Sequence, residues 1–280
     1  MEQFSSHPLY KKHTLDSAMS SLWDFYRKRF LVLFTASFVM SLLMQYFSTT
    51  IDFSSLTSLT DPYEMLAKMK EFIWPMVILS LVNLLFTTIL QYYIIYCPVD
   101  SSVNIFNSLY KALKYFVPYL IIIVLFAFFG SFALLLGLLA LIIGIFFVAL
   151  YLMTIYMFFL PLLMVEGNNI GHAITRSFRL AHKGFWTNLG WVAVFVLILI
   201  VLSLVLSMII MIPFTGSIFK GIINPEEAVN AIDYLKNPAY IILGSLVNAL
   251  YFPLLPIFAT ILYFNSMTKE EEGVRESESV

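Results

Sequence analysis

A chain of 280 residues with 60% hydrophobic and only 12% charged residues lies outside the range of soluble domains, where about a quarter of the residues are charged. Its mean hydropathy of +0.88 predicts a polytopic membrane protein, and its net charge of −1, without a broad basic domain, argues against nucleic acid as a partner. A single cysteine excludes an intrachain disulfide, and the four scattered histidines supply no cluster for a metal ion. No metal or cofactor is therefore expected.

Charged residues mark the ends of the predicted spans. Five long runs contain no Asp, Glu, Lys or Arg, and the third, from Tyr115 to Val165, is about twice as long as the roughly 20 residues that cross a membrane. This run is expected to form a hairpin with its turn near Gly137, although glycines at seven-residue intervals also suit close helix packing. The sequence therefore predicts an all-α bundle of six transmembrane helices, the last kinked at Pro253 and Pro256. The predicted spans are residues 30–47, 72–96, 118–136, 141–163, 186–212 and 239–263.

Three amphipathic segments lead into predicted spans, and we interpret them as interfacial helices on the cytoplasmic leaflet. They are residues 15–28, residues 103–116 and a basic helix within residues 164–186. In the third, one face is expected to carry Ile170, Ala173, Ile174, Phe178 and Ala181, and the opposite face His172, Arg176, Arg179 and Lys183. The expected organisation is a mobile N-terminal segment (1–14), a single six-span membrane domain (15–267) and a solvated acidic cytoplasmic tail (268–280).

Lysine and arginine predict the orientation. In the six-span arrangement, twelve of the sixteen lie on the side of both termini, and four, Lys68, Lys70, Lys220 and Lys236, lie on the other side. The positive-inside rule then places both termini in the cytoplasm and the chain in the bacterial cytoplasmic (inner) membrane. Two outer loops carry acidic residues, namely Asp52, Asp61 and Glu64 in one and Glu226, Glu227 and Asp233 in the other.

Short matches within the chain predict a threefold internal repeat. Ser21, Ser108 and Ser177 are each followed, six positions later, by a basic residue and then by an aromatic residue and a span. A second match links Ser80-Leu-Val-Asn83 to Ser245-Leu-Val-Asn248. The repeating unit would be an interfacial helix, a span, an outer turn and a second span, covering about residues 15–97, 102–165 and 169–266.

Three segments carry a family resemblance. They are Phe159-Leu-Pro-Leu-Leu-Met-Val-Glu-Gly167, Ala173-Ile-Thr-Arg-Ser-Phe-Arg-Leu180 and Lys183-Gly-Phe-Trp186. Together they resemble the membrane domain associated with glycerophosphodiester phosphodiesterases and related bacterial inner-membrane proteins of unknown function. The resemblance implies a helical bundle. It does not carry over the phosphodiesterase activity, which belongs to a separate catalytic barrel in that family.

Two groups of residues are candidate sites. Near the third amphipathic helix, Arg176, Arg179 and Lys183 would meet a lipid headgroup phosphate or a partner protein, with Glu166 orienting one of the cations. Exposed cations are also typical topology signals, and Glu166 would then simply pair with Arg176 or cap the following helix, with Asn168 or Asn169 as N-cap. At span depth, Asn83 and Asn248 either line a cavity or form hydrogen bonds between helices.

The leading functional hypothesis is a non-enzymatic membrane- or lipid-associated accessory or scaffold protein. Its expected partners are the phospholipid membrane and a protein within it, and no catalytic residue is assigned because the predicted spans contain no ionisable Asp, Glu, Lys, Arg or His. The alternative is a transporter or export component for an apolar or lipid-like solute, whose path Asn83 and Asn248 would line. A third hypothesis is a lipid-modifying enzyme that uses Glu166 with His172 or His182.

Overall fold

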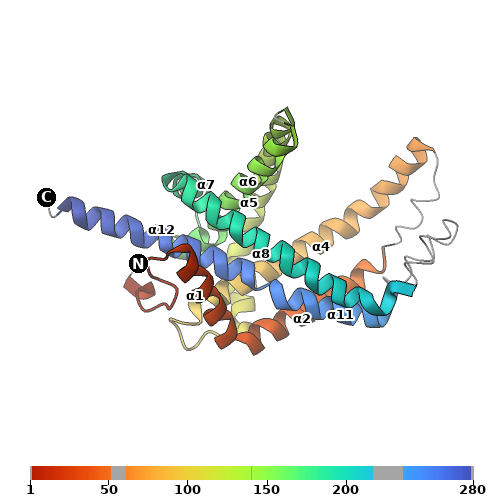
Figure 1. The fold of residues 1–280 in the computed structure, drawn as a ribbon, viewed down its shortest axis with the longest axis horizontal. Coiled ribbons are helices and arrows are strands. Elements are labelled where there is room, and N and C mark those ends of the chain that lie inside the picture. Colours follow the sequence, from red (N-terminus) through yellow and green to blue (C-terminus); the bar gives the residue numbers. More distant parts are fainter. Residues whose placement is uncertain (1, 52–60, 140, 217–235, 279–280) are drawn as a thin grey trace. The chain divides into compact units, whose positions relative to one another are not determined.

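The computed structural model describes residues 2–51, 61–139, 141–216 and 236–278, and the regular structure in these ranges is helical (Figure 1). Short 3-10 turns lie at Glu2–Phe4 and Ile212–Phe214. The predicted all-α fold is therefore confirmed. The α-helices are α1 (Leu15–Lys28), α2 (Phe30–Ser48), α4 (Pro62–Tyr96), α5 (Ile105–Leu139), α6 (Leu141–Val165), α7 (Ile170–Lys183), α8 (Phe185–Met211), α11 (Pro238–Tyr251) and α12 (Leu254–Glu278).

Six helical stretches among the described residues are long and apolar enough to cross a membrane, as the sequence predicted. Many of their large apolar side chains are exposed, which suits lipid as the surrounding solvent. The chain is thus a multi-pass membrane protein. The acidic loop residues Asp52, Glu226, Glu227 and Asp233 lie outside the described residues. The six stretches are Phe30–Ser48, Leu66–Tyr96, Ile105–Leu139, Ile143–Val165, Phe185–Phe214 and Pro238–Gly273.

The described chain divides into two compact units, where the sequence predicted a single membrane domain for residues 15–267. Unit 1 comprises Met1–Phe30, Thr87–Ile198 and Pro253–Val280, and unit 2 comprises Leu31–Phe86 and Leu199–Phe252. Each unit therefore draws on segments that are far apart in the sequence.

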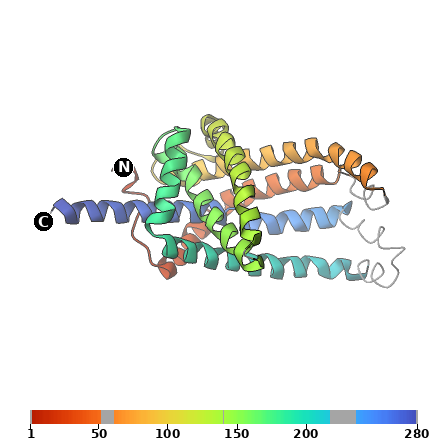
Figure 2. The same ribbon diagram turned by 90° about the horizontal axis from the view of Figure 1, so that it is seen from above.

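The core of unit 1 is built around the first half of α12. Every side chain from Ile257 to Asn265 is nearly inaccessible to solvent, so this helix is buried on all sides. Its buried Thr260 accepts a hydrogen bond from the Nε2 amide of Gln91 at 2.6 Å. Beside this core, α5 and α6 run next to each other as a hairpin (Figures 1 and 2).

The N-terminal segment, predicted to be mobile, makes buried contacts within unit 1. Phe4 and Leu9 are each only 1% exposed, and the Nε2 atom of His7 donates to the carbonyl oxygen of Ile94 at 3.1 Å. The backbone N–H of His13 donates to Asn265 Oδ1 at 2.9 Å. A few apolar and ring side chains in a polar stretch thus pack this segment against the rest of unit 1.

The acidic tail also differs from the expectation of a purely solvated end. Helix α12 continues to Glu278, because Lys, Glu and Arg are good helix formers. The hydroxyl of Tyr10 donates to Glu271 at 2.6 Å, and Lys12 lies 2.7 Å from Glu272. The tail is therefore tied to the N-terminal segment.

The second amphipathic segment is not a separate helix, contrary to prediction. Residues 105–116 form the first part of α5, which continues through Pro118 into the span. Pro118 has no N–H for the carbonyl of Lys114 four residues earlier, and the side-chain amide of Asn168 donates to that oxygen instead at 2.8 Å. This substitute donor explains how the helix continues through the proline.

Helix α5 extends to Leu139 and α6 begins at Leu141, so Gly137, near which the turn was predicted, lies within the last turn of α5. Gly137 instead marks a close approach of the two helices. A Cβ atom on Gly137 would lie 3.1 Å from the backbone oxygen of Gly144 and 3.1 Å from Val148 Cγ2. The prediction of close packing through these glycines is therefore confirmed at this pair.

At the predicted proline kink of the last span the helix is interrupted, although Phe252 keeps α-helical dihedral angles. Helix α11 ends at Tyr251 and α12 begins at Leu254. Pro253 cannot donate to the carbonyl of Ala249, so the helical ladder is interrupted there. Phe252, the last residue of unit 2, lies in this break.

Candidate functional site

The connection between α6 and α7 positions the first candidate site, in unit 1. Gly167 has φ +112°, a left-handed conformation that suits glycine and ends α6. Asn169 then caps α7, its side chain accepting the backbone N–H of His172 at 2.9 Å. This tight connection holds Glu166 over the first turns of α7, and the prediction of an asparagine N-cap is confirmed.

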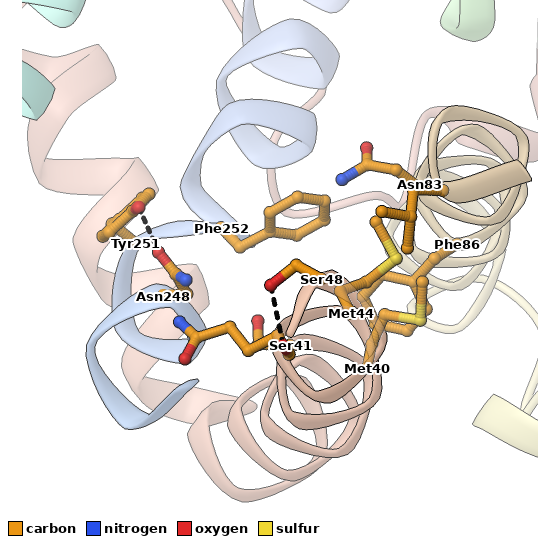
Figure 3. Close-up of a pocket in the computed structure, with 11 residues that line it drawn as sticks. Met40, Ser41, Met44, Ser48, Asn83, Phe86, Asn248, Tyr251 and Phe252 are labelled. Atoms are coloured by element: carbon orange, nitrogen blue, oxygen red, sulfur yellow. Dashed lines mark hydrogen bonds between the residues drawn. The ribbon is translucent and has the colours of Figure 1, made fainter. Parts of the chain in front are cut away.

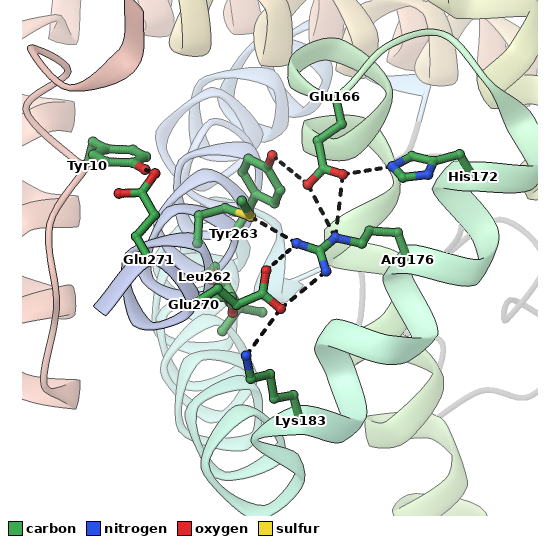
Figure 4. A network of polar contacts seen from close by, with 11 residues as sticks. Tyr10, Glu166, His172, Arg176, Lys183, Leu262, Tyr263, Glu270 and Glu271 are labelled. Atoms are coloured by element: carbon green, nitrogen blue, oxygen red, sulfur yellow. Dashed lines mark hydrogen bonds and ion pairs between the residues drawn. The ribbon is translucent and has the colours of Figure 1, made fainter. Parts of the chain in front are cut away.

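Glu166 is the centre of a polar network that joins three helices (Figure 4). Its carboxylate accepts a hydrogen bond from the Tyr263 hydroxyl at 3.0 Å and lies 2.8 Å from His172 Nε2. It also lies 3.4 Å from Arg176 Nε. The predicted pairing of Glu166 with Arg176 is thus present. His172, named beside Glu166 in the enzyme hypothesis, is a second partner, and Tyr263 is one that the sequence did not indicate.

Arg176 is shared between two carboxylates. Its guanidinium pairs with Glu270 of α12 through both terminal nitrogens, with Nη1 at 3.2 Å from Oε1. Lys183 lies 3.4 Å from the same carboxylate. The side chains of Arg176, Glu166 and Glu270 are only 10%, 13% and 18% exposed, so water screens these pairs weakly.

The electrostatics of the network are balanced. Burial alone would lower the pKa of Arg176, but the hydrogen bond to Glu270 and the charges of both carboxylates outweigh it and raise that pKa. Two acidic side chains, Glu166 and Glu270, and two basic side chains, Arg176 and Lys183, compensate one another. An internally neutralised cluster of this kind joins α6, α7 and α12, but Arg176 is not left facing outward for a phosphate.

The predicted faces of α7 require a correction. Arg176 is predicted for the exposed face but is buried, whereas the 37% exposure of Phe178 agrees with an apolar face that meets lipid. The pairing with Glu270 explains the difference, because it turns the Arg176 side toward α12. Arg179 is exposed, and no salt bridge is found for it among the described residues. His182 contacts Tyr151 at 3.2 Å and does not join the Glu166 network.

The second candidate site is a cavity of about 390 Å³ in unit 2, between α2, α4 and α11 (Figure 3). Both predicted asparagines line it, with Asn83 across the pocket from Asn248. Both asparagines therefore line a cavity, as one of the two predicted interpretations has it. The wall is completed by Met40, Ser41, Met44, Gln45, Ser48, Leu79, Phe86, Tyr251 and Phe252.

The two matched tetrapeptides meet at this cavity. The aromatic residue three positions after each asparagine, Phe86 or Tyr251, also lines the wall, as expected for neighbours on one helix face. The Tyr251 hydroxyl donates to Asn248 Oδ1. Sequence reasoning missed Gln45, although a glutamine inside a predicted span was a visible signal.

The described lining of the cavity combines neutral amides and hydroxyls with Met, Leu and Phe and includes no Asp, Glu, Lys, Arg or His. A second pocket, of about 280 Å³, shares Met44, Leu79 and Asn83 with it and reaches the exposed Ser80. Across the described residues, no group of three His, Cys, Asp or Glu side chains is placed to hold a metal ion.

The fold and these sites define a multi-pass helical membrane protein with one buried ionic cluster and one neutral polar cavity at span depth. No protein-family model, curated protein or solved structure matches the chain.

Proposed function

We propose that this chain is a lipid-associated protein of the bacterial cytoplasmic membrane that binds an apolar or lipid-like solute in the cavity of unit 2. The observation that carries the proposal is the cavity itself, which Asn83 and Asn248 line together with apolar side chains. Its volume of about 390 Å³ falls within the roughly 300–1,000 Å³ typical of small-molecule sites.

The chemistry of the wall indicates the class of ligand. Asn248 already accepts from Tyr251 at Oδ1, so its NH₂ group supplies donors for an ester, carbonyl or hydroxyl oxygen. The methionine, leucine and phenylalanine side chains contact hydrocarbon, and Met adapts to irregular shapes. A neutral amphiphile therefore fits better than a charged solute, because the described lining offers no counter-charge.

A cavity-filling substitution tests this function. Ser41→Phe places a ring in the cavity, whereas Ser131→Phe places the same ring on an exposed position of α5. Mass spectrometry of the gently extracted proteins should show one neutral lipid class bound to the wild type and to Ser131→Phe but depleted from Ser41→Phe. Identical lipid profiles for the three proteins would remove the proposal.

Transport of the same solute is the second candidate function, favoured by the helix break beside the cavity. Phe252 lines the cavity and lies between α11 and α12, and broken helices often flank the binding sites of transporters. Pro253→Ala restores a backbone donor for Ala249 and is expected to slow solute flux in proteoliposomes while binding persists. If flux is no faster than in protein-free liposomes, the protein binds the solute without transporting it.

The proposed orientation has both termini in the cytoplasm, on the evidence of lysine and arginine distribution. A phosphatase reporter that is active only outside the cytoplasm is expected to be inactive when fused to the C-terminus. The resemblance to the membrane domain associated with glycerophosphodiester phosphodiesterases agrees with a lipid environment and assigns no reaction to this chain.

A further inference from the structure

A second cavity, of about 340 Å³, lies in unit 1, where the N-terminal segment crosses α1. Its wall contains three cationic side chains, Lys11, Lys28 and Arg29, and one carboxylate, Asp24. With all four groups charged, the wall carries a formal charge of +2. This cavity uses none of the residues of the unit 2 cavity or of the Glu166 network.

The cations of this cavity are not neutralised internally. Across the described residues, no salt bridge is found for Lys11, Lys28 or Arg29, whereas Arg176 pairs with two carboxylates. The guanidinium of Arg29 lies over the ring of Phe25 at 4.4 Å, a contact that orients the cation and leaves its charge in place. The positive wall is therefore available to an anion.

The cavity is held by packed elements. Lys11 follows Leu9, which is 1% exposed, and the segment is anchored by the hydrogen bond from His7 to Ile94. Helix α1 begins with a capping box in which Thr14 and Ser17 bond each other's backbone N–H groups. The cations thus sit on a preformed surface, which lowers the entropy lost on binding.

The position of the cavity matches the level of lipid headgroups. Arg29 immediately precedes the span Phe30–Ser48, and Pro98, also in the wall, follows the span that ends at Tyr96. Trp23 on α1 is 58% exposed, as expected for an aromatic side chain at a membrane interface. Basic pockets between the ends of spans suit the phosphate groups of anionic lipids.

We propose that Lys11, Lys28 and Arg29 form a binding site for a phosphate group, carried either by an anionic lipid headgroup or by a free phosphate. The three cations contact the phosphate oxygens, Arg29 as a fork of donors and the lysines as point charges. Asp24 at the rim weakens the attraction and thereby sets the affinity. This site is independent of the proposed solute cavity.

The experiment measures binding to the full-length purified protein from the shift in its melting temperature. The probes are short-chain phosphatidylglycerol, short-chain phosphatidylcholine and inorganic phosphate. Lys11→Gln/Lys28→Gln/Arg29→Gln is compared with a charge-matched control, Arg27→Gln/Lys111→Gln/Arg179→Gln, whose residues are not among those that line the cavity. The pocket variant should lose affinity for phosphatidylglycerol by about tenfold or more, and the control should lose much less.

The outcomes distinguish the two possible sources of the phosphate group, a lipid headgroup and a free phosphate. If the pocket variant loses affinity for phosphatidylglycerol alone, the ligand is a lipid headgroup. If it loses affinity for inorganic phosphate to the same extent, the ligand is a free phosphate. Equal losses in the pocket variant and the control, or no binding of either anionic probe by the wild type, would overturn the proposal. If the triple variant does not fold, Asp24→Asn decides, because removing this exposed carboxylate should tighten anion binding by about fivefold, and unchanged or weaker binding contradicts the site.

Discussion

Arg176 on α7 and Glu270 on α12 form a two-point ion pair although 94 residues separate them. The pair explains two departures from simple helical patterning: the arginine of an amphipathic helix turns inward, and an acidic tail becomes part of a packed helix. The pair also suggests that the stability of unit 1 depends on the C-terminal part of α12, which carries Glu270.

Loss of Glu270 should destabilise the protein measurably. In Glu270→Gln the partly buried guanidinium of Arg176 keeps only Glu166 as a charged partner, and we expect a loss of about 1–3 kcal/mol in the free energy of unfolding. Glu272→Gln is the matched control, since Glu272 forms an exposed pair with Lys12 and should cost less than about 1 kcal/mol. Equal effects of the two substitutions in denaturant unfolding would show that the network contributes nothing beyond a surface pair.

Stability should fall in mildly acidic conditions through His7. Burial is the main reason that the pKa of His7 is lowered from 6.5 to about 4, and nearby Arg29 lowers it further, while the hydrogen bond to Ile94 opposes both. As pH falls below 6.5 the unfolded chain binds a proton that the folded chain does not, so stability decreases down to about pH 4 by a total of about 3 kcal/mol.

The variant His7→Gln tests this dependence, because glutamine can still donate to Ile94 and does not titrate. Unfolding free energies measured between pH 7 and about pH 4 should decline less steeply for the variant than for the wild type. Burial also lowers the pKa of His13, which leaves a smaller slope of the same sign. Replacing the exposed His182 with Gln is the control, and a slope unchanged by His7→Gln would contradict the assignment.

Gly137→Ala should destabilise the α5–α6 hairpin. The new methyl group would meet the Gly144 backbone and Val148 at 3.1 Å, and backbone cannot move aside cheaply. We expect a loss of about 1–3 kcal/mol. Gly190→Ala on the exposed face of α8 meets nothing within 4 Å and should instead gain up to about 1 kcal/mol from helix propensity. Thermal unfolding of the two variants in detergent should therefore shift in opposite directions, and shifts of the same sign would count against a close contact at Gly137.

Gly244→Ala should alter the cavity without unfolding unit 2. A Cβ atom on Gly244 would lie 2.7 Å from Nε2 of Gln45, the flexible end of a side chain that lines the cavity. The glutamine amide must move, so retention of the bound solute should change while the melting temperature stays within a few degrees. Solute retention equal to that of the wild type would show that the Gln45 amide does not contact the ligand.

Much of the fold followed from local properties of the chain. Uncharged runs of sufficient length specified six spans, because an apolar helix of about 20 residues can be buried in lipid whatever its neighbours are. Two contacts between residues that are close in the sequence were also predicted: Asn169 caps α7, and Glu166 pairs with Arg176.

Errors arose where the outcome depended on partners far along the chain. The helix through Pro118 continues because Asn168 supplies the missing donor, and residues 4–13 are ordered by contacts with the ends of α4 and α12. Neither partner can be recognised from the segments themselves.

Composition and charge by themselves determined that this protein is a six-span helical membrane protein with two asparagines at span depth. Only the tertiary structure decided that Arg176 pairs with Glu270 and that Gln45 and Tyr251 line the same cavity as Asn248. It also decided that Lys11, Lys28 and Arg29 line one cavity. The physical reason is range: hydrophobic burial and capping act along a helix, whereas charge compensation and cavities depend on which helices meet.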